Sequence, residues 1–414
     1  MVDKPSRAAV SLAPTPTTER IPILDVVRGF AIFGILLVNL NTFTYHRSYE
    51  HATGWTLLSK FLNRGAEQLI AQFGSGKFIT LFSFLFGLGF ALQLVRVEAR
   101  GLSIVRIYCR RLIVLLAIGL IHAFLIWEGD ILVYYASTGF LLLFFRDFKP
   151  RTLLACAALF YLLPLVKWEV TLYQHVRKTP SSQVGQSLPS QIGQENDIEQ
   201  DEINRRVFRH GSFREIESRR IHNVLVFYSE ALQEAPRRLA LFLLGLYAGK
   251  RQVFRDIRSN AVFFWRLGSV GLVVGLIGNI GLYILYNPLP IWTSLLKPVT
   301  AVMGIFGWAA VYVSALVHLI EKEAWRQWLL PIAEVGRAAL SNYLLQSLFF
   351  VTIFYSYGLG LFGKIEPAVG VCLTMLIYVF ELFVTKWWLK RFRFGPVEWI
   401  WRTLTYGTHQ PVRL

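Results

Sequence analysis

Cysteine is scarce in this chain, which contains three in 414 residues: Cys109, Cys156 and Cys372. They form no CxxC pair, and all three lie within or at the edge of long apolar runs. This excludes a disulfide framework and offers no ligand set for zinc, so we expect no metal. Charged residues are also few, at 17%, whereas 54% of the residues are apolar. That balance excludes an ordinary water-soluble domain and is typical of a protein that crosses a membrane several times.

Apolar runs at or near the length that crosses the hydrocarbon core of a bilayer, roughly 20 residues, recur along the sequence. We therefore predict an all-α fold: a polytopic integral membrane helix bundle of about ten transmembrane helices, with the lipid bilayer as a partner. The predicted spans are 22–43, 68–95, 106–127, 130–146, 151–172, 237–253, 261–286, 292–318, 335–357 and 366–390.

Acidic residues are outnumbered: Lys and Arg total 43, Asp and Glu total 26, and the formal net charge is +17. Most of the basic residues lie at span ends, where their side chains reach lipid headgroups, so we expect no nucleic-acid partner. Basic residues in short loops mark the cytoplasmic side, and ten alternating spans place them all on one face. We therefore expect a multi-pass protein of the bacterial cytoplasmic (inner) membrane, with both termini in the cytoplasm.

The hydropathy profile divides the chain into five parts. A long hydrophilic insert separates two groups of spans; its residues 179–200 have the composition of a flexible segment, whereas residues 201–233 favour an amphipathic helix. Residues 394–407 combine Trp and Arg as a helical anchor at the membrane interface does. The parts are a cytoplasmic tail (1–21), an N-terminal transmembrane bundle with the candidate active site (22–172), the extracytoplasmic insert (173–236), a C-terminal transmembrane bundle (237–393) and a cytoplasmic interfacial tail (394–414).

The third predicted span carries an ionisable cluster, and a titratable residue inside the membrane is by default a functional-site hypothesis. Arg106, Arg110 and Arg111 gather at its cytoplasmic end, and His122 follows Arg106 by 16 residues, roughly 24 Å along a helix axis. Asp130 lies eight residues beyond His122, where a turn could fold it back. A carboxylate there would fix the imidazole tautomer, as in a general base. The alternative is a histidine hydrogen-bonded only for packing.

The first span begins with Asp25 and Arg28, which are three residues apart and share a helix face. They indicate either an ion pair that only anchors the helix end or an anion-binding arginine held by its aspartate. Asn39 lies near the outer end of the span, where its amide can bond a neighbouring helix or a substrate. His51 follows in the outer loop, where a histidine usually faces solvent.

The second span begins with the sequence Gly-Ser-Gly-Lys at 74–77, which resembles part of a phosphate-binding loop. It lacks the first glycine of GxxxxGK[ST] and follows no strand, so we discard a nucleotide-binding loop. Lys77 is retained as a candidate functional residue below the outer surface. Farther along, Gly87 and Gly89 indicate close helix packing.

The ninth span carries Arg337, Asn342 and Gln346, polar residues that recur at about one helical turn and so line one stripe. A polar stripe of this kind faces protein or water rather than lipid.

The chain contains a set of motifs spread over nearly its whole length: Leu24-Asp25-x-x-Arg28-Gly29, Gly76-Lys77-Phe78, Leu81-Phe82-Ser83-x-x-Phe86-Gly87-x-Gly89, His122 through Asp130-Ile131-Leu132, Gly336-Arg337 to Gln346, and Gly395-Pro396-x-Glu398-Trp399-x-Trp401-Arg402. Together these stretches resemble the YeiB-like family of bacterial membrane proteins, a domain of unknown function, and the motifs are specific to that family as a set. The family in turn is similar to transmembrane acyltransferases, among them the lysosomal heparan-α-glucosaminide acetyltransferase and the sugar O-acyltransferases of bacterial envelopes.

The resemblance implies an enzyme that moves an acyl group, most simply acetyl, from cytoplasmic acyl-coenzyme A (acetyl-CoA) to an extracytoplasmic acceptor such as an envelope sugar. His122, oriented by Asp130, would be the base. Asn39 followed by His51 is similar to the asparagine and histidine pair of the lysosomal enzyme, so His51 is a competing base. A homodimer is compatible with the family. The implied donor-binding residues are Arg28, Arg106, Arg110, Arg111 and Arg337, and the implied substrate or oxyanion residues are Asn39, Lys77, Glu128, Asn342 and Gln346.

A transporter is the alternative from a different class. In it, Lys77, His122, Asp130 and Arg337 would form a polar pathway near the midplane. Such folds often contain inverted repeats, and the sequence shows no clear internal repeat. A purely structural membrane protein would leave the intramembrane ionisable groups unexplained.

Overall fold

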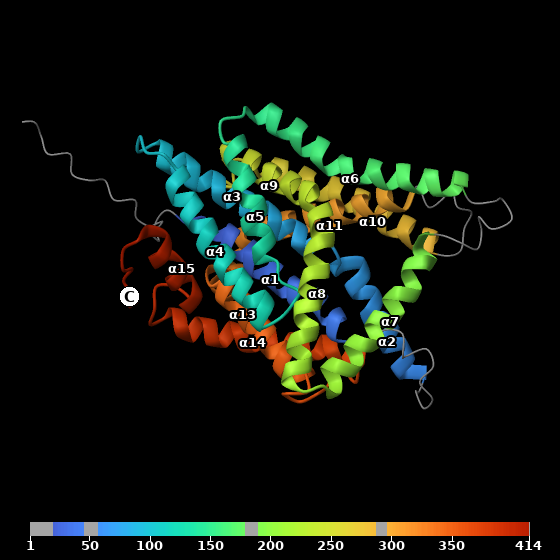
Figure 1. Cartoon of the computed structure of the whole chain (residues 1–414). Coiled ribbons are helices and arrows are strands. Elements are labelled where there is room, and N and C mark those ends of the chain that lie inside the picture. Colours follow the sequence, from blue (N-terminus) through green and yellow to red (C-terminus); the bar gives the residue numbers. More distant parts are fainter. Residues whose placement is uncertain (1–19, 45–56, 179–188, 287–295, 414) are drawn as a thin grey trace, which may run out of the picture.

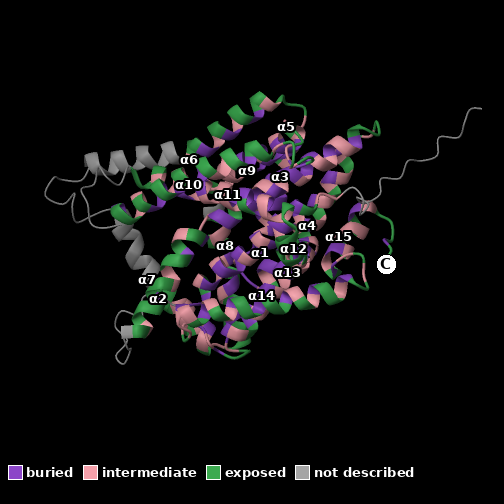
Figure 2. Cartoon of the chain, turned by 180° about the vertical axis from the view of Figure 1, so that it is seen from behind, coloured by how far each residue is buried: buried purple, intermediate pink, exposed green. Residues whose placement is uncertain are grey.

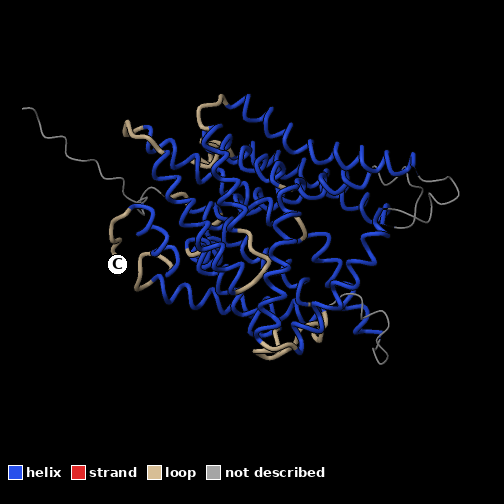
Figure 3. The backbone as a smooth tube through the Cα atoms, in the orientation of Figure 1, coloured by secondary structure: helices blue, strands red, loops and turns tan. Residues whose placement is uncertain are grey.

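The computed structural model describes residues 20–44, 57–178, 189–286 and 296–413 (Figure 1). Within these ranges every regular element is a helix, and the only extended pairing is a single bridge between Phe392 and Arg413 (Figure 3). The helices are α1 (Pro22–Phe43), α2 (Leu57–Leu69), the π-helical turn η2 (Ile70–Gly74), α3 (Lys77–Glu98), α4 (Val105–Leu125), α5 (Leu132–Phe145), α6 (Pro150–Lys178), α7 (Pro189–His210), α8 (Phe213–Gln233), α9 (Ala235–Lys250), α10 (Ala261–Tyr286), α11 (Leu296–Glu321), α12 (Glu323–Arg337), α13 (Ala339–Phe354), α14 (Pro367–Leu389) and α15 (Pro396–Tyr406).

The protein is an all-α polytopic membrane helix bundle. In the described part of the chain, six segments are long and apolar enough to cross a membrane: α1, the run Leu58–Glu98, α4, α10, α11 and α14. Shorter apolar helices are α5, α13 and the first half of α6 (Pro150–Pro164). Each of the ten predicted spans coincides with one of these helices or, for the sixth span, with α9.

Two predicted spans are divided by a break that hydropathy does not reveal. The second, 68–95, is interrupted between η2 and α3, where Gly76 adopts a left-handed conformation with φ of 77° that a residue with a side chain rarely takes. The ninth, 335–357, begins inside α12 and is interrupted at Ala338 before α13 starts. Both breaks place helix ends within the bundle.

α1 lies at the centre of the bundle, and Val26, Ala31, Ile32 and Leu36 on it are completely buried (Figure 2). It packs closely on α12 because Gly336 lies directly against the backbone of Asp25, where a Cβ would not fit. The first turn of α1 and the last turn of α12 are thereby fixed together.

α3 crosses α9 at two glycines. A Cβ on Gly87 would overlap the backbone of Phe242, and a Cβ on Gly245 would overlap the backbone of Phe84. The prediction of close helix packing at Gly87 is therefore confirmed. At Gly89 it is wrong: no described atom lies within 4 Å of a Cβ built there, and the residue lines a cavity instead.

The insert between the two groups of spans is largely helical. Residues 189–200, expected to be flexible, form the first half of α7, and residues 179–188 lie outside the described part. The amphipathic helix predicted for 201–233 is divided: residues 201–210 end α7, and residues 213–233 form α8. α8 starts with a capping box: the Ser212 N–H donates to Glu215 Oε2 at 2.7 Å, and the Glu215 N–H faces Ser212 Oγ at 3.4 Å. The Tyr134 hydroxyl, on α5, donates to the Phe227 carbonyl at 2.8 Å and fastens α8 to the bundle.

Candidate functional site

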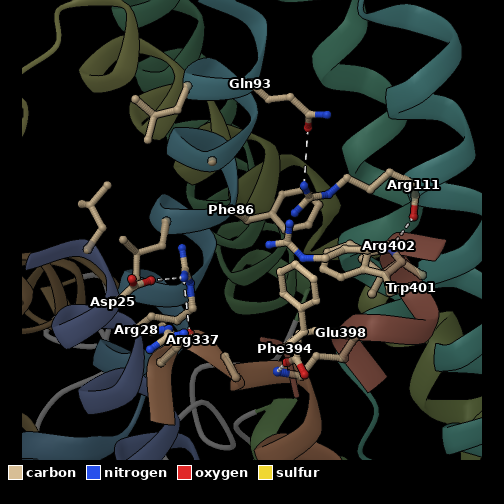
Figure 4. A pocket seen from close by; sticks show the side chains of 18 of the residues that line it. Asp25, Arg28, Phe86, Gln93, Arg111, Arg337, Phe394, Glu398, Trp401 and Arg402 are labelled. Carbon is tan, nitrogen blue, oxygen red and sulfur yellow. Dashed lines mark hydrogen bonds and ion pairs between the residues drawn. The ribbon is translucent and has the colours of Figure 1, made fainter. Parts of the chain in front are cut away.

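A cavity of about 330 Å³ opens between α1, α3, α4, α12 and the C-terminal segment that carries α15. Its lining contains seven arginines and two carboxylates, Asp25 and Glu398 (Figure 4). Guanidinium groups stay charged and match phosphate and carboxylate oxygens, so the part of the cavity where the arginines gather attracts anions. We call it the arginine pocket; its arginines are Arg20, Arg28, Arg96, Arg111, Arg337, Arg393 and Arg402.

Arg28 is positioned by its own helix and by α12. Its Nη1 donates to Asp25 Oδ1 at 2.8 Å and reaches the Gly336 carbonyl at 3.3 Å. The predicted pairing of Asp25 with Arg28 is therefore present. Because both residues line the pocket, the pair is part of its wall and not only an anchor of the helix end.

Aromatic rings hold two other arginines in place. The Arg111 guanidinium lies 4.3 Å from the centre of the Trp401 ring and donates to Gln93 Oε1 at 3.4 Å. The Arg402 guanidinium lies 4.7 Å from the centre of the Phe394 ring. Figure 4 shows Arg111 and Arg402 approaching the pocket from two different elements. Stacking on a ring orients a guanidinium without neutralising it, so the charge remains available to a ligand.

Two further pocket arginines, Arg20 and Arg337, lie near each other. Burial, together with the nearby Arg337, lowers the pKa of Arg20 to about 10, and Arg20 is therefore still protonated at neutral pH. The Nε of Arg337 is buried and has no hydrogen-bond partner among the described residues. Buried donors are normally paired, so this guanidinium nitrogen remains able to donate a hydrogen bond within the pocket.

Glu398 ties the C-terminal segment to the bundle. Its carboxylate accepts hydrogen bonds from the Leu340 N–H at 2.6 Å, from the Ser341 N–H at 3.0 Å and from the Ser341 hydroxyl. These N–H groups belong to the first turn of α13, where a helix favours a negative charge. Burial nevertheless raises the pKa of this carboxyl. α15 is therefore more than the predicted interfacial anchor, because it forms one wall of the arginine pocket.

Away from the arginines the lining becomes apolar. Phe82, Leu85 and Leu115 cover its sides, and the cavity reaches Leu132 and Tyr135 at the beginning of α5. An extended ligand with an anionic end and an uncharged arm matches this change in polarity.

His122 and Asp130 form a buried pair near this inner end. Nδ1 of His122 lies 2.8 Å from Asp130 Oδ2, and the two side chains are 1% and 0% exposed. Asp130 Oδ1 accepts the Val133 N–H at 2.8 Å, which holds the carboxylate at the first turn of α5. A histidine tautomer with its proton on Nδ1 can donate to this carboxylate oxygen and leaves Nε2 as an acceptor. Nε2 has no hydrogen-bond partner in the described part of the chain. This is the geometry of a general base with its orienting carboxylate.

Tyr343 lies between the arginine pocket and the histidine. It lines the pocket, and its ring centroid is 5.2 Å from that of His122. Its hydroxyl accepts the Ile131 N–H and donates to the Gly129 carbonyl, each at 3.3 Å. His122 itself does not line the pocket, so this ring separates the base from the cavity.

Glu128 is held between the insert and the bundle. Its carboxylate accepts a hydrogen bond from the Tyr355 hydroxyl at 3.1 Å and faces Asn223 Nδ2, on α8, at 3.4 Å. The side chain is 9% exposed. Through these contacts Glu128 connects α8 to the turn that carries Asp130.

The other predicted residues fall into three groups. Arg106 and Arg110 are exposed and do not line the pocket, although Arg111 beside them does. Asn39 is half-buried on α1 outside the pocket lining, and His51 lies outside the described residues. The third group is buried and hydrogen-bonded elsewhere: Lys77 to the Ala71 carbonyl, Asn342 to the Val335 carbonyl and Thr385, and Gln346 to Glu381.

Four pocket arginines were not proposed from the sequence: Arg20, Arg96, Arg393 and Arg402. Arg20, Arg96 and Arg393 lie at or just beyond helix ends, where basic residues are expected from topology alone, and Arg402 lies within α15. For Arg402 the sequence did offer a signal, the motif at Gly395–Arg402. Its residues Glu398, Trp401 and Arg402 all line the pocket. Among the described residues, no group of three His, Cys, Asp or Glu side chains could hold a metal ion.

Comparison with known sequences gives a family and several full-length relatives. The family described as "Protein of unknown function (DUF418)" matches residues 248–408. "Uncharacterized protein YxaH" of Bacillus subtilis is 38% identical over 97% of this chain and 98% of its own length. "Uncharacterized protein YeiB" of Escherichia coli is 28% identical over 95% of this chain and 98% of its own. A 39.9 kDa protein from the amylase 3' region of Bacillus acidopullulyticus is 26% identical over 97% and 98%.

Proposed function

Because the chain belongs to the DUF418 family of YeiB-like membrane proteins, whose descriptions assign no activity, we propose its function from its own site. We propose that it is a transmembrane acyltransferase. It takes an acyl group, most simply acetyl, from a coenzyme A thioester in the arginine pocket and passes it to an acceptor beside His122. The observation that carries this proposal is a cavity with seven arginines at one end that leads towards a buried His–Asp pair at the other.

The arginine pocket suits this donor for two reasons. A coenzyme A thioester carries phosphates at one end, and Arg28, Arg111, Arg337 and Arg402 present guanidinium groups to them. Its uncharged arm then follows the apolar lining inward. Arg111 and His122 are 11 residues apart on α4, about 16 Å along the axis, a distance that an extended arm can cover.

In the proposed reaction the acceptor oxygen or nitrogen forms a bond to the acyl carbon as its proton passes to Nε2 of His122. The carbon–sulfur bond then breaks, and the proton passes from Nε2 to the leaving thiolate. The products are the acylated acceptor and the free thiol of coenzyme A. Asp130 keeps the Nδ1 proton in place and stabilises the imidazolium between the two steps. The ring of Tyr343 turns aside to admit the thioester.

The orientation in the membrane is part of the proposal. The arginine pocket faces the cytoplasm, both termini are cytoplasmic, and the membrane is the bacterial inner membrane. Basic loops support this, since they meet at one end of the bundle: Lys250 donates to the carbonyls of Arg146 and Phe148, and Arg258 pairs with Glu321 at 2.9 Å. The acceptor then lies on the extracytoplasmic side. A homodimer stays a prediction.

Neighbouring arginines on α4 provide a sharp test. We expect Arg111→Gln to weaken acetyl-CoA binding about ten- to a hundredfold, because a charged hydrogen-bond partner is lost from the pocket. Arg110→Gln removes the same charge one residue away on an exposed position and is the matched control. Binding is measured by calorimetry on the purified protein in lipid nanodiscs, and thiol release by a colorimetric reagent. Equal effects of the two substitutions, or no binding by the wild type, contradict the proposal.

A transporter remains the second candidate because of one buried polar pair. Gln346 Nε2, on α13, donates to Glu381 Oε2, on α14, at 2.8 Å, and Glu381 is fully buried outside the arginine pocket. An intramembrane carboxyl of this kind is common in proton-coupled carriers. Proteoliposomes that move a solute in a proton-dependent way, with loss of flux in Glu381→Gln and without thiol release from acetyl-CoA, would favour this function.

A further inference from the structure

The cavity follows one face of α3 and ends at an aromatic side chain. The α3 residues that line it recur at helical spacing, from Arg96 at one end to Phe82 at the other, and so form one stripe. These two residues are 14 positions apart, roughly 21 Å along the helix axis. α3 begins at Lys77, but none of the residues 77–81 lines the cavity. Along α3, the cavity therefore ends at the ring of Phe82.

Three aromatic side chains from different helices lie around this inner end: Phe82 of α3, Tyr135 of α5 and Tyr343 of α13. We call them the aromatic wall. Phe82 meets Tyr135 edge to face, with ring centroids 5.7 Å apart. The Tyr343 hydroxyl accepts the N–H of Ile131, which lies one helical turn before Tyr135 and also lines the cavity. All three rings thus border one space.

The two tyrosines of the aromatic wall are held with different firmness. The Tyr135 hydroxyl lies 2.8 Å from Ser83 Oγ, and its ring stacks on Phe86 and on Phe242, each with centroids 5.4 Å apart. The Tyr343 hydroxyl makes two hydrogen bonds of 3.3 Å each, longer than the usual range. Tyr343 is therefore the ring that can turn aside, whereas Tyr135 stays in place.

We infer that the aromatic wall restricts the donor to a short acyl group, acetyl or propionyl, and that Phe82 and Tyr135 set this limit. The inference rests on the proposed function. The thioester meets His122 beside Tyr343, because that ring separates the base from the cavity. Acyl carbons beyond the thioester carbonyl then lie against Phe82 and Tyr135. A longer chain has to displace packed rings, and overfilling a packed site is unfavourable.

The experiment compares acetyl-, butyryl- and hexanoyl-CoA as ligands of the full-length protein in nanodiscs, with empty nanodiscs to correct for partition into lipid. Calorimetry gives the Kd of each thioester. For the wild type we expect hexanoyl-CoA to bind at least about tenfold more weakly than acetyl-CoA. Phe82→Ala removes one ring of the wall and should reduce this difference about tenfold. Phe82→Leu should reduce it less.

Phe84→Ala is the matched control. It removes the same ring from the same helix, but Phe84 packs against Phe254, with centroids 6.1 Å apart, and does not line the cavity. This variant should keep the wild-type ratio of the hexanoyl-CoA and acetyl-CoA affinities. Thermal unfolding shows whether each variant folds, and Phe82→Leu provides the ratio if Phe82→Ala does not.

Thiol release, measured on the same preparations, separates this inference from the proposed function. Length-dependent binding that Phe82→Ala relaxes, without thiol release from any donor, would overturn the acyltransferase and leave the aromatic wall standing. A wild type that binds hexanoyl-CoA as tightly as acetyl-CoA overturns the inference. So does an affinity ratio that Phe82→Ala leaves unchanged, or that Phe84→Ala changes equally. If none of the three thioesters binds, both proposals fail.

Discussion

At the scale of single residues, His122 depends on one carboxylate. The Nδ1 to Oδ2 contact of 2.8 Å is made in a place where neither side chain reaches solvent. In such surroundings the interaction of an imidazolium with a carboxylate is much stronger than in water. Asp130 also has a second, structural contact, since its other oxygen accepts the Val133 N–H. The two carboxylate oxygens of Asp130 thus make different contacts, and a substitution can alter one contact while it keeps the other.

The variant Asp130→Asn separates these contacts. Its amide oxygen can still accept the Val133 N–H, so the fold should persist with a Tm near that of wild type. The negative charge that stabilises the imidazolium is lost, and we expect acetyl transfer to fall about 10²- to 10⁴-fold. Thiol release and Tm are measured on the same preparation. His318→Gln, on α11, is the control, because His318 Nδ1 donates to the Ser314 carbonyl of its own helix and the residue does not line the arginine pocket. A fully active Asp130→Asn protein would refute the role of the pair.

At this scale, contacts between residues close in sequence could be predicted, whereas those that depend on tertiary packing could not. His122 and Asp130 are separated by one helix end and one turn, and helix geometry alone brought them within reach. Arg111 and Arg110 differ by a rotation of about 100° around α4, and nothing local indicates which of them faces the pocket. The contact of Asn223 with Glu128 could not be assigned, because it depends on how α8 docks.

At the scale of the elements, two glycines that are two residues apart, and so face nearly opposite sides of the helix, have opposite roles on α3. Gly87 faces α9 and brings the two backbones together, whereas Gly89 faces the arginine pocket and keeps it open. The sequence pattern indicated small residues for packing but not which face of the helix meets another helix. That choice follows from the position of α9, which comes after the insert in sequence.

Alanine substitutions at these two positions should therefore differ. Gly87→Ala places a methyl group into the backbone of Phe242 and should lower the free energy of unfolding by about 1–3 kcal/mol. Gly89→Ala meets empty space and should keep the stability of the wild type. The larger Gly89→Leu should fold as well but fill the pocket and raise KM for acetyl-CoA. Thermal unfolding in detergent and thiol-release kinetics check the three variants; equal destabilisation by Gly87→Ala and Gly89→Ala would contradict the packing described here.

At the scale of the whole molecule, the distribution of basic residues and the position of the arginine pocket support the same orientation of the protein in the membrane. Three pocket arginines, Arg20, Arg96 and Arg337, lie at the ends of α1, α3 and α12. α8 of the insert packs against the turn between α4 and α5 that carries Asp130 (Figure 1). This arrangement is compatible with donor and acceptor binding from opposite faces, as the proposed reaction needs.

Cysteine labelling in intact cells tests that direction. In a background with Cys109, Cys156 and Cys372 replaced by serine, Ser103→Cys lies in the connection between α3 and α4, and Arg214→Cys lies at the start of α8. Both positions are exposed. A membrane-impermeant maleimide should label Arg214→Cys in intact cells and Ser103→Cys only after permeabilisation. The reverse pattern would place the arginine pocket outside and remove its access to cytoplasmic thioesters.

The sequence by itself determined the class of the protein, because hydrophobic length is a local property: the apolar helices follow from it, and the eight-residue spacing of His122 and Asp130 made their pairing possible. Only the tertiary structure decided that residues from α1, α3, α4, α12 and the C-terminal segment share one pocket, and that α8 packs against the turn that carries Asp130. Those contacts join residues hundreds of positions apart. They depend on which helix faces meet, and amphipathic patterns are weak where lipid and protein interior are equally apolar.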